Sequence, residues 1–233
     1  MRVLLAAFVL TVLIGLTTTP SAAQFVSFPA SAAVAMPSPL TTSAEAAGIA
    51  EMVRGANGRG RRWIRRPGLV VVTSVLQFDG FERKTYVATE DVIDPLEAAR
   101  LAQDLTDGLG VLTGDRFRDF ANVRFERPAA GERVPILRDG QIVVGRFHGI
   151  ATALNAVGYG GRLARPDGTI TSGTIMLDSE YDRTDALHRL LRLHELGHAL
   201  GYNHVKSQRS IMNPTLGSEP TDFDRRVALI AFR

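Results

Sequence analysis

The sequence contains no cysteine, and this absence removes several kinds of chemistry at once. A chain without cysteine forms no disulfide, offers no thiolate to a metal and has no cysteine nucleophile. Lysine is nearly absent as well, because only Lys84 and Lys206 accompany the many arginines, and the formal net charge is +3. None of the basic and aromatic patterns of nucleic-acid-binding modules accompanies this charge, so no nucleic-acid partner is expected.

Charged residues are also missing between Arg2 and Glu45. Within this stretch an apolar run at residues 3–16 is followed by small residues at 17–23, a pattern typical of a signal peptide that is cleaved before Gln24. The pattern predicts a secreted or periplasmic protein. The apolar run is shorter than the about 20 residues that a bilayer span needs, so no stable membrane span is expected after cleavage. A retained membrane anchor is the alternative.

Composition divides the chain into three parts. Residues 1–23 are the predicted signal peptide. Residues 24–68 are rich in small and polar residues and predict a flexible or propeptide-like segment, with a short helix at residues 45–54. The arginine-rich end of this segment is either a polar linker or a propeptide junction open to cleavage at Arg62 or Arg66. Residues 69–233 show regular hydrophobic periodicity and predict one folded domain.

The periodicity of residues 69–233 predicts an α+β fold, because the strands gather in the middle of the chain and the helices are few. Asp94 and Thr221 are the expected helix caps. Strands are expected at residues 69–78, 121–126, 141–147, 158–165 and 173–177, and helices at residues 95–109, 185–200 and 221–232.

Histidine is rare too, yet three of the five histidines fall within residues 193–204, which read LHELGHALGYNH. On a helix His194 and His198 lie one turn apart on the same face, so both imidazoles can reach one metal ion. Glu195 is rotated from that face by about 100° and can reach a water on the metal without being a ligand. A continuous helix would carry His204 to another face. Glycine adopts positive φ readily, so a turn at Gly201 brings His204 back as the third ligand.

Three neutral imidazoles with one open coordination position are typical of a catalytic Zn2+ site, whereas structural zinc sites are closed by four protein ligands. Zinc lowers the pKa of bound water from about 16 to about 7 and polarises a carbonyl group. Glu195 is the expected general base, which takes the proton of the water and passes it to the leaving amine. The other two histidines, His148 and His188, are expected to be ordinary surface or core residues.

The motif from His194 to His204 resembles the extended zinc motif of the metzincin metalloproteases. Residues 210–214 read SIMNP and resemble the Met-turn of that family, in which the methionine, here Met212, lies beneath the metal. Pro214 stands where two other metzincin branches have a metal-binding tyrosine, so the similarity is to the matrixin-like branch. The resemblance implies an α+β zinc protease domain at residues 69–233, with a twisted, mostly antiparallel-edged sheet, an active-site helix and a C-terminal helix.

The resemblance also implies how a substrate is held. A peptide would pair antiparallel with an exposed sheet edge at residues 159–165, through Gly161, Leu163 and Ala164. Pro214 would begin a wall of the pocket beyond the scissile bond.

An aspartate of the last helix, Asp222 or Asp224, would bind the backbone of the Met-turn, as a similar residue does in matrixins. Two features depart from the family. The propeptide cysteine that silences many matrixins is absent, and Val205 is not the usual residue after the third histidine. A group of four acidic residues is either a calcium site or simply a solvated acidic loop. Its members are Asp167, Asp178, Glu180 and Asp182.

The leading hypothesis is therefore a monomeric, secreted zinc endopeptidase that acts on protein or peptide substrates. Two alternatives stay open. One is a hydrolase narrowed to cell-wall peptide or to a single partner protein. The other is a metzincin-like binding module that keeps zinc and no longer cleaves, although the presence of Glu195 argues against that loss of activity.

Overall fold

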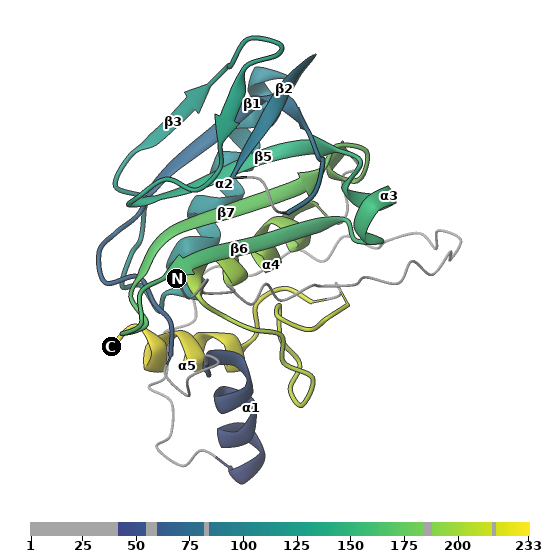
Figure 1. The fold of residues 1–233 in the computed structure, drawn as a ribbon. Coiled ribbons are helices and arrows are strands. Elements are labelled where there is room, and N and C mark those ends of the chain that lie inside the picture. Colours follow the sequence, from purple (N-terminus) through teal and green to yellow (C-terminus); the bar gives the residue numbers. More distant parts are fainter. Residues whose placement is uncertain (1–41, 55–59, 82–83, 184–187, 216–217) are drawn as a thin grey trace, which may run out of the picture.

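The computed structural model describes residues 42–54, 60–81, 84–183, 188–215 and 218–233 (Figure 1). The predicted signal peptide lies outside the described residues, as does the first part of the segment at residues 24–68. Within the described ranges, no helix has both the length and the apolar character needed to cross a membrane.

Seven strands form one twisted sheet, in the order β4-β2-β1-β5-β7-β6, with β3 paired beside β1. β1 runs parallel to β3 and β5, and β5 runs parallel to β7, whereas β2, β4 and β6 pair antiparallel. The sheet is thus mixed, with antiparallel pairs toward both ends of the strand order. The strands are β1 (Gly68–Gln77), β2 (Thr85–Val92), β3 (Val123–Glu126), β4 (Arg133–Pro135), β5 (Gln141–His148), β6 (Gly158–Ala164) and β7 (Ile170–Asp178).

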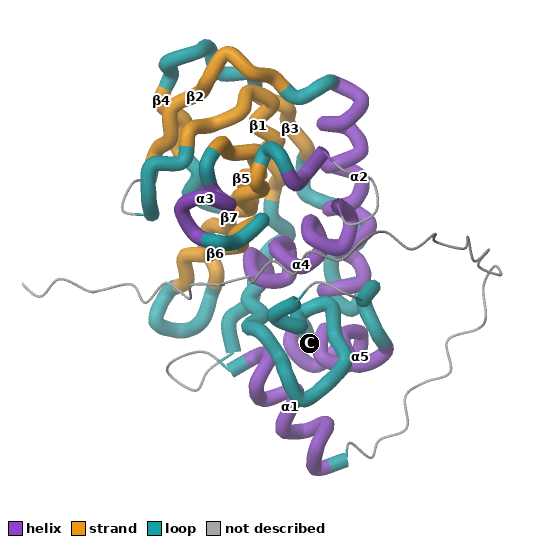
Figure 2. The backbone as a smooth tube through the Cα atoms, turned by 90° about the vertical axis from the view of Figure 1, so that its right-hand side faces the viewer, coloured by secondary structure: helices purple, strands orange, loops and turns teal. Residues whose placement is uncertain are grey.

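Helices α2 and α4 cover one face of this sheet (Figure 2), whereas the short helix α3 packs on the other face. Apolar residues of β1, β5 and β7 on the face that α2 and α4 cover share one core with α2, α4 and α5, which confirms the predicted α+β class. A second apolar cluster, which includes Tyr86, Phe147 and Met176, fills the other face. The helices are α1 (Ser43–Val53), α2 (Pro95–Leu112), α3 (Ile150–Leu154), α4 (His188–Leu200) and α5 (Asp222–Ala231), with a 3-10 turn η1 (Tyr181–Arg183).

Both predicted helix caps are present, but α2 does not end where the sequence suggested. The Asp94 carboxylate accepts the backbone N–H of Leu96 at 2.9 Å, and Thr221 caps α5. α2 continues past residue 109, where the predicted helix ended, to Leu112. Gly108 is a contact point with α4, since a Cβ at this position would lie 2.9 Å from Cγ of Leu193. The glycine therefore serves close helix packing and not chain termination.

The segment at residues 24–68 is folded wherever the structure describes it. Met52 of α1 is fully buried, and Trp63 joins the same core as the sheet and α4. The indole Nε1 of Trp63 donates to the carbonyl oxygen of Ala199 at 3.0 Å. Apolar side chains of residues 42–54 and 60–68 therefore contribute to the main core, and α1 agrees with the helix expected at residues 45–54. The domain boundary at residue 69 stays a prediction.

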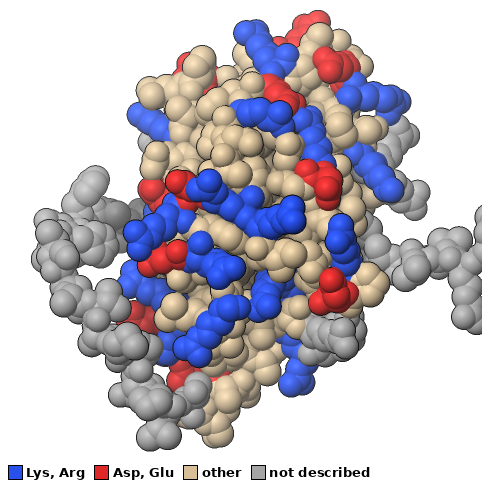
Figure 3. All heavy atoms as spheres, turned by 90° about the vertical axis from the view of Figure 1, so that its left-hand side faces the viewer, with Lys and Arg blue, Asp and Glu red and all other residues tan. Residues whose placement is uncertain are grey.

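The arginine-rich stretch pairs with the hairpin between β6 and β7. The backbone N–H of Arg62 donates to Gly168 O at 3.1 Å, and the N–H of Ile170 donates to Arg62 O at 2.9 Å. Cleavage at Arg62 would require this pairing to open first. Basic side chains gather on this face of the molecule (Figure 3), where Arg61, Arg62, Arg65, Arg66 and Arg165 line two neighbouring hollows.

A buried cluster of charges fixes α4 relative to the sheet and α2. Asp182 is fully buried and accepts hydrogen bonds from Arg146 of β5 at 2.8 Å and from Arg192 of α4 at 3.0 Å. Arg146 also forms a bidentate pair with Glu97, and Arg192 reaches Asp104 at 2.7 Å. Breaking a buried ion pair by removing one partner costs about 3–5 kcal/mol. These contacts therefore hold α4 against β5 and α2.

Candidate active site

The structure brings His194, His198 and His204 together. The first two lie one turn apart on α4, and the chain reverses after it at Gly201, whose φ of +121° favours glycine. A Cβ on Gly201 would also lie 3.0 Å from the carbonyl carbon of Arg61. Nε2 of His204 lies 3.1 Å from Nε2 of His194 and 3.2 Å from Nε2 of His198. In the described part of the chain, no other group of three potential ligand side chains is close enough to hold a metal.

Backbone carbonyls fix the tautomers of the two helical histidines. Nδ1 of His194 lies 2.7 Å from Ile211 O, and Nδ1 of His198 lies 3.0 Å from Tyr202 O. A carbonyl oxygen only accepts, so each Nδ1 carries the proton and each Nε2 keeps a lone pair. Burial lowers the pKa of His194 to about 4 and also lowers the pKa values of His198 and His204. All three rings are therefore neutral at neutral pH.

These nitrogens suit a zinc ion. Zn–N bonds of about 2.0–2.1 Å in a tetrahedral site separate the nitrogens by about 3.3 Å. The observed separations of 3.1 and 3.2 Å are close to that value. The lone pairs on Nε2 of His194 and His198 lie beside Nε2 of His204, and a cation at the centre of the three nitrogens attracts them. Donation of Nδ1–H to a carbonyl is the usual way in which proteins orient a metal-binding histidine.

Glu195 is buried beside the histidines. Its side chain is 1% exposed, and its Oε2 atom has no hydrogen-bond partner among the described residues. Burial raises the pKa of Glu195 to about 8, although the backbone N–H of Gly160 opposes the shift. A buried, unpaired carboxylate oxygen is costly unless it has a function, so it marks a candidate proton acceptor.

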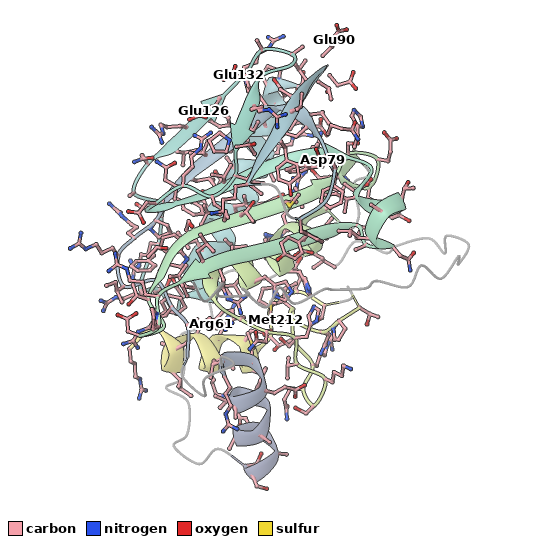
Figure 4. All side chains as sticks on the ribbon, viewed as in Figure 1. Arg61, Asp79, Glu90, Glu126, Glu132 and Met212 are labelled. Carbon is pink, nitrogen blue, oxygen red and sulfur yellow. The ribbon has the colours of Figure 1, made fainter. Side chains whose placement is uncertain are left out.

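Met212 lies below α4 in the view of Figure 4 and is fully buried. It packs against Gly197, where an added Cβ would lie 3.2 Å from the Met212 Cε atom and closer still to its sulfur. The backbone N–H of Val205 donates to Met212 O at 3.0 Å. This backbone hydrogen bond therefore joins the turn that contains Met212 to the loop that carries His204.

Asp224 holds the turn that contains Met212. Its carboxylate accepts the N–H of Ile211 at 3.1 Å and the hydroxyl of Ser210. It also accepts the N–H of Thr221 at 2.7 Å, which completes a capping box at the start of α5. Of the two aspartates named from the sequence, Asp224 makes this contact, whereas Asp222 is exposed.

β6 crosses α4 at very short range because it is rich in glycine. A Cβ on Gly160 would overlap the carbonyl oxygen of Glu195 and lie 2.6 Å from Cβ of His198. A Cβ on Gly158 would lie 3.0 Å from Oε1 of Glu195. A strand with an exposed edge was expected here, and these contacts explain its glycines. The signal that could have revealed them is the repeated glycine in GYGG.

Three of the four residues named for substrate contact lie on this strand. Gly161 is buried, whereas Leu163 is 37% exposed and Ala164 is exposed. β6 is the last strand of the sheet order, and among the described residues no strand pairs with its outer edge. Pro214 lies elsewhere, on an open hollow of about 450 Å³ after the turn of Met212. Residues 216–217, which follow it, lie outside the described part of the chain.

The acidic residues named for calcium have other partners. Asp178 accepts the N–H groups of Ala151 and Glu180, and Asp182 accepts two buried arginines. Asp167 is exposed and accepts the N–H of Thr169 at 2.8 Å. Calcium binding thus stays a prediction without a prepared group of carboxylates. His148 lies away from the three clustered histidines and contacts Asp91 at 2.8 Å.

Residues 151–226 of the chain match the model of the matrixin peptidase family. The match begins in α3 and runs through β6, β7, α4 and the turn of Met212 into α5, so it includes every site residue described above. No curated protein gives a significant match to the chain. The metzincin resemblance is thereby confirmed: residues 151–226 of this α+β protein are matrixin-like, and they contain three histidines that are placed to hold a metal ion.

Proposed function

We propose that the protein is a zinc endopeptidase in which Glu195 is the general base. The observation that carries this proposal is the meeting of the Nε2 atoms of three histidines beside a buried carboxylate whose Oε2 has no partner among the described residues. A structural zinc site would need a fourth protein ligand, and among the described residues only three potential ligands meet.

Zinc held by His194, His198 and His204 would polarise the scissile carbonyl and lower the pKa of a water. Glu195 accepts a proton from the attacking water and later donates it to the leaving nitrogen. A raised pKa suits both tasks, because the carboxyl group can exchange its proton near neutral pH. The N–H of Gly160 interacts with the same carboxylate and orients it.

The outer edge of β6 is the proposed docking strand for the substrate. An extended peptide that pairs antiparallel with Gly161, Leu163 and Ala164 would gain main-chain hydrogen bonds without a sequence requirement. The short approach of β6 to Glu195 supports this assignment, since a peptide on that edge passes beside the metal ligands. Pro214 would border the pocket beyond the scissile bond.

Several further features belong to the proposal. Export rests on the sequence of residues 1–23, and a monomer is expected. The catalytic unit starts earlier than residue 69, because Met52 and Trp63 are part of its core. Two alternatives stay open: a hydrolase restricted to cell-wall peptide or to one partner protein, and a binding module that no longer cleaves.

The experiment compares the chain from Gln24 with its Glu195→Gln variant. Zinc per chain is measured by metal analysis, and cleavage is measured on a quenched peptide library with and without chelator. We expect one zinc in both proteins, and a loss of about 10²–10⁴-fold in hydrolysis in the variant, the usual contribution of a general base. Equal hydrolysis by both proteins would contradict the role of Glu195. Zinc in both with no cleavage of any peptide would favour either the binding module or a hydrolase restricted to a substrate outside the library.

A further inference from the structure

The loop that carries His204 is bound to α1, a helix far away in the sequence. α1 lies beside this loop in Figure 1. Five hydrogen bonds connect the two: Asn203 N to Met52 O at 2.8 Å, Asn203 Nδ2 to Arg54 O at 2.8 Å, Lys206 N to Glu51 Oε1 at 2.9 Å, Ser207 Oγ to Glu51 Oε2 at 2.8 Å, and Gln208 Nε2 to Ala44 O at 3.3 Å.

Most of these bonds use groups near the C-terminal end of α1. The last carbonyl groups of a helix lack an intrahelical donor, and Met52 O lies in the last turn of α1. It receives the N–H of Asn203, the residue directly before His204. The Glu51 carboxylate receives two donors from the other side of His204. The loop is thus held on both flanks of the third histidine.

The three histidines differ in what positions them. His194 and His198 are fixed by the backbone of α4 and by the carbonyls that accept their Nδ1–H groups. His204 lies in a loop without helical hydrogen bonds. Its position depends on contacts to neighbouring segments, which are the turn of Met212 on one side and α1 on the other.

α1 is itself firmly seated. Glu45 forms an ion pair with Arg226 of α5, and Met52 is fully buried. Gly48 packs so closely that a Cβ would lie 2.6 Å from Cγ of Gln208 and 3.3 Å from Phe223. Burial raises the pKa of Glu51, but the N–H of Lys206 and the hydroxyl of Ser207 outweigh this effect and lower it, as expected for a carboxylate held by donors.

We propose that α1 is a positioning element of the metal centre, which holds His204 in place through Glu51 and the backbone carbonyls of Met52 and Arg54. Removal of this helix would loosen the third ligand. The segment before residue 69 therefore supports the active site, in contrast to a propeptide whose removal activates an enzyme. The inference rests on the metal site of the proposed function but not on peptide hydrolysis.

The test measures zinc affinity by competition with a chromophoric chelator in the wild type and in two variants of α1. Glu51→Ala removes both carboxylate contacts to the loop. Glu45→Ala is the matched control, since it removes a carboxylate of the same helix that contacts α5 and not the loop. We expect an affinity loss of about 10-fold for Glu51→Ala, at the lower end of the range for residues that support metal ligands. Glu45→Ala should bind zinc as the wild type does.

A second readout reports ligand geometry. Co2+ in place of zinc gives visible absorption bands that depend on the positions of the three imidazoles. Glu51→Ala should change these bands, and Glu51→Gln, which keeps one acceptor oxygen, should restore them in part. Ser207→Ala, which removes a single exposed contact, should weaken zinc binding less and in the same direction. Far-UV circular dichroism checks that each variant folds.

Unchanged zinc affinity and Co2+ bands in Glu51→Ala would overturn the proposal. An equal loss in Glu45→Ala would also overturn it, because the effect would then reflect general stability of α1. A wild type that binds zinc tightly, loses it in Glu51→Ala and yet cleaves no peptide would contradict the proposed hydrolysis while supporting the role of α1. A wild type that binds no zinc would overturn both.

Discussion

Arg162 of β6 and His198 of α4 share one acceptor, the carbonyl oxygen of Tyr202. The His198 Nδ1 atom lies 3.0 Å from this oxygen and the Arg162 guanidinium lies 3.2 Å from it. Arg162 also donates to His198 O at 2.7 Å and to Asn203 Oδ1 at 2.9 Å. Burial lowers the pKa of Arg162 to about 10, so the group stays charged at neutral pH. One cation from the sheet thus stabilises the end of α4 and the turn that leads to His204.

Arg162→Met is expected to weaken zinc binding. The change removes donors from the carbonyls of His198 and Tyr202 and from Asn203, so the turn after α4 loses its main side-chain support. An affinity loss of about 10–100-fold is expected for a partner of this kind. Chelator competition measures it, with the exposed Arg165→Met as the matched control. Equal zinc affinity of the two variants would refute a positioning role for Arg162.

The metal ligands could be predicted from the sequence because they form a local pattern. His194 and His198 lie one helical turn apart, and Gly201 permits the reversal that returns His204. The Met212 turn and Asp224 could be named through family resemblance, and Asp224 does bind the turn. Local spacing is sufficient when the ligands come from one short segment.

The support of the site could not be predicted, since its partners are distant in the sequence. Glu51 contacts Ser207, and Trp63 contacts Ala199, across more than a hundred residues. Glu51 lies in the short helix expected at residues 45–54, whereas Trp63 lies in a glycine- and arginine-rich stretch whose composition is typical of linkers. Trp63 is nevertheless buried in the main core. The strands β2 and β4 were not predicted either, and β4 has only three residues and includes Pro135.

Gly160→Ala should destabilise the protein. An added Cβ would overlap the backbone of Glu195 and press on Cβ of His198, so β6 and α4 must move apart. Overpacking of this kind costs about 1–3 kcal/mol in the free energy of unfolding, measured by chemical denaturation. The control is Gly145→Ala in β5, where the nearest atom would lie at 3.5 Å, an ordinary contact. If Gly160→Ala destabilises the protein no more than Gly145→Ala does, β6 does not approach α4 as closely at Gly160 as these distances indicate.

Trp63→Ala should lower the free energy of unfolding by about 3–5 kcal/mol, because it removes a buried aromatic side chain and its hydrogen bond to Ala199. The neighbouring Ile64 is 55% exposed, and Ile64→Ala is expected to change stability by about 0.5 kcal/mol or less. A chain that starts at Leu69 lacks both Met52 and Trp63 and should be less stable still than Trp63→Ala. Equal stability of the chains that start at Thr42 and at Leu69 would mean that these residues are dispensable.

Stability of the metal-free protein should depend on pH through Glu195. Burial raises its folded-state pKa from 4.5 to about 8, so the folded protein binds the proton more tightly than the unfolded chain does. This contribution is fully present below pH 4.5 and is lost as the pH rises through 8. The folded state must then bear the cost of a buried, unpaired charge.

Glu195→Gln removes this titration, so the variant should gain stability relative to the wild type as the pH rises from about 4.5 to 8. The difference amounts to about 1.4 kcal/mol for each unit of pKa shift. The three histidines, whose pKa values are lowered, titrate in both proteins and cancel from the comparison. Urea denaturation of both proteins, with chelator present, at several pH values between 4.5 and 9 measures the difference. A difference that stays constant with pH would show that the Glu195 carboxylate is as well solvated in the folded protein as in the unfolded chain.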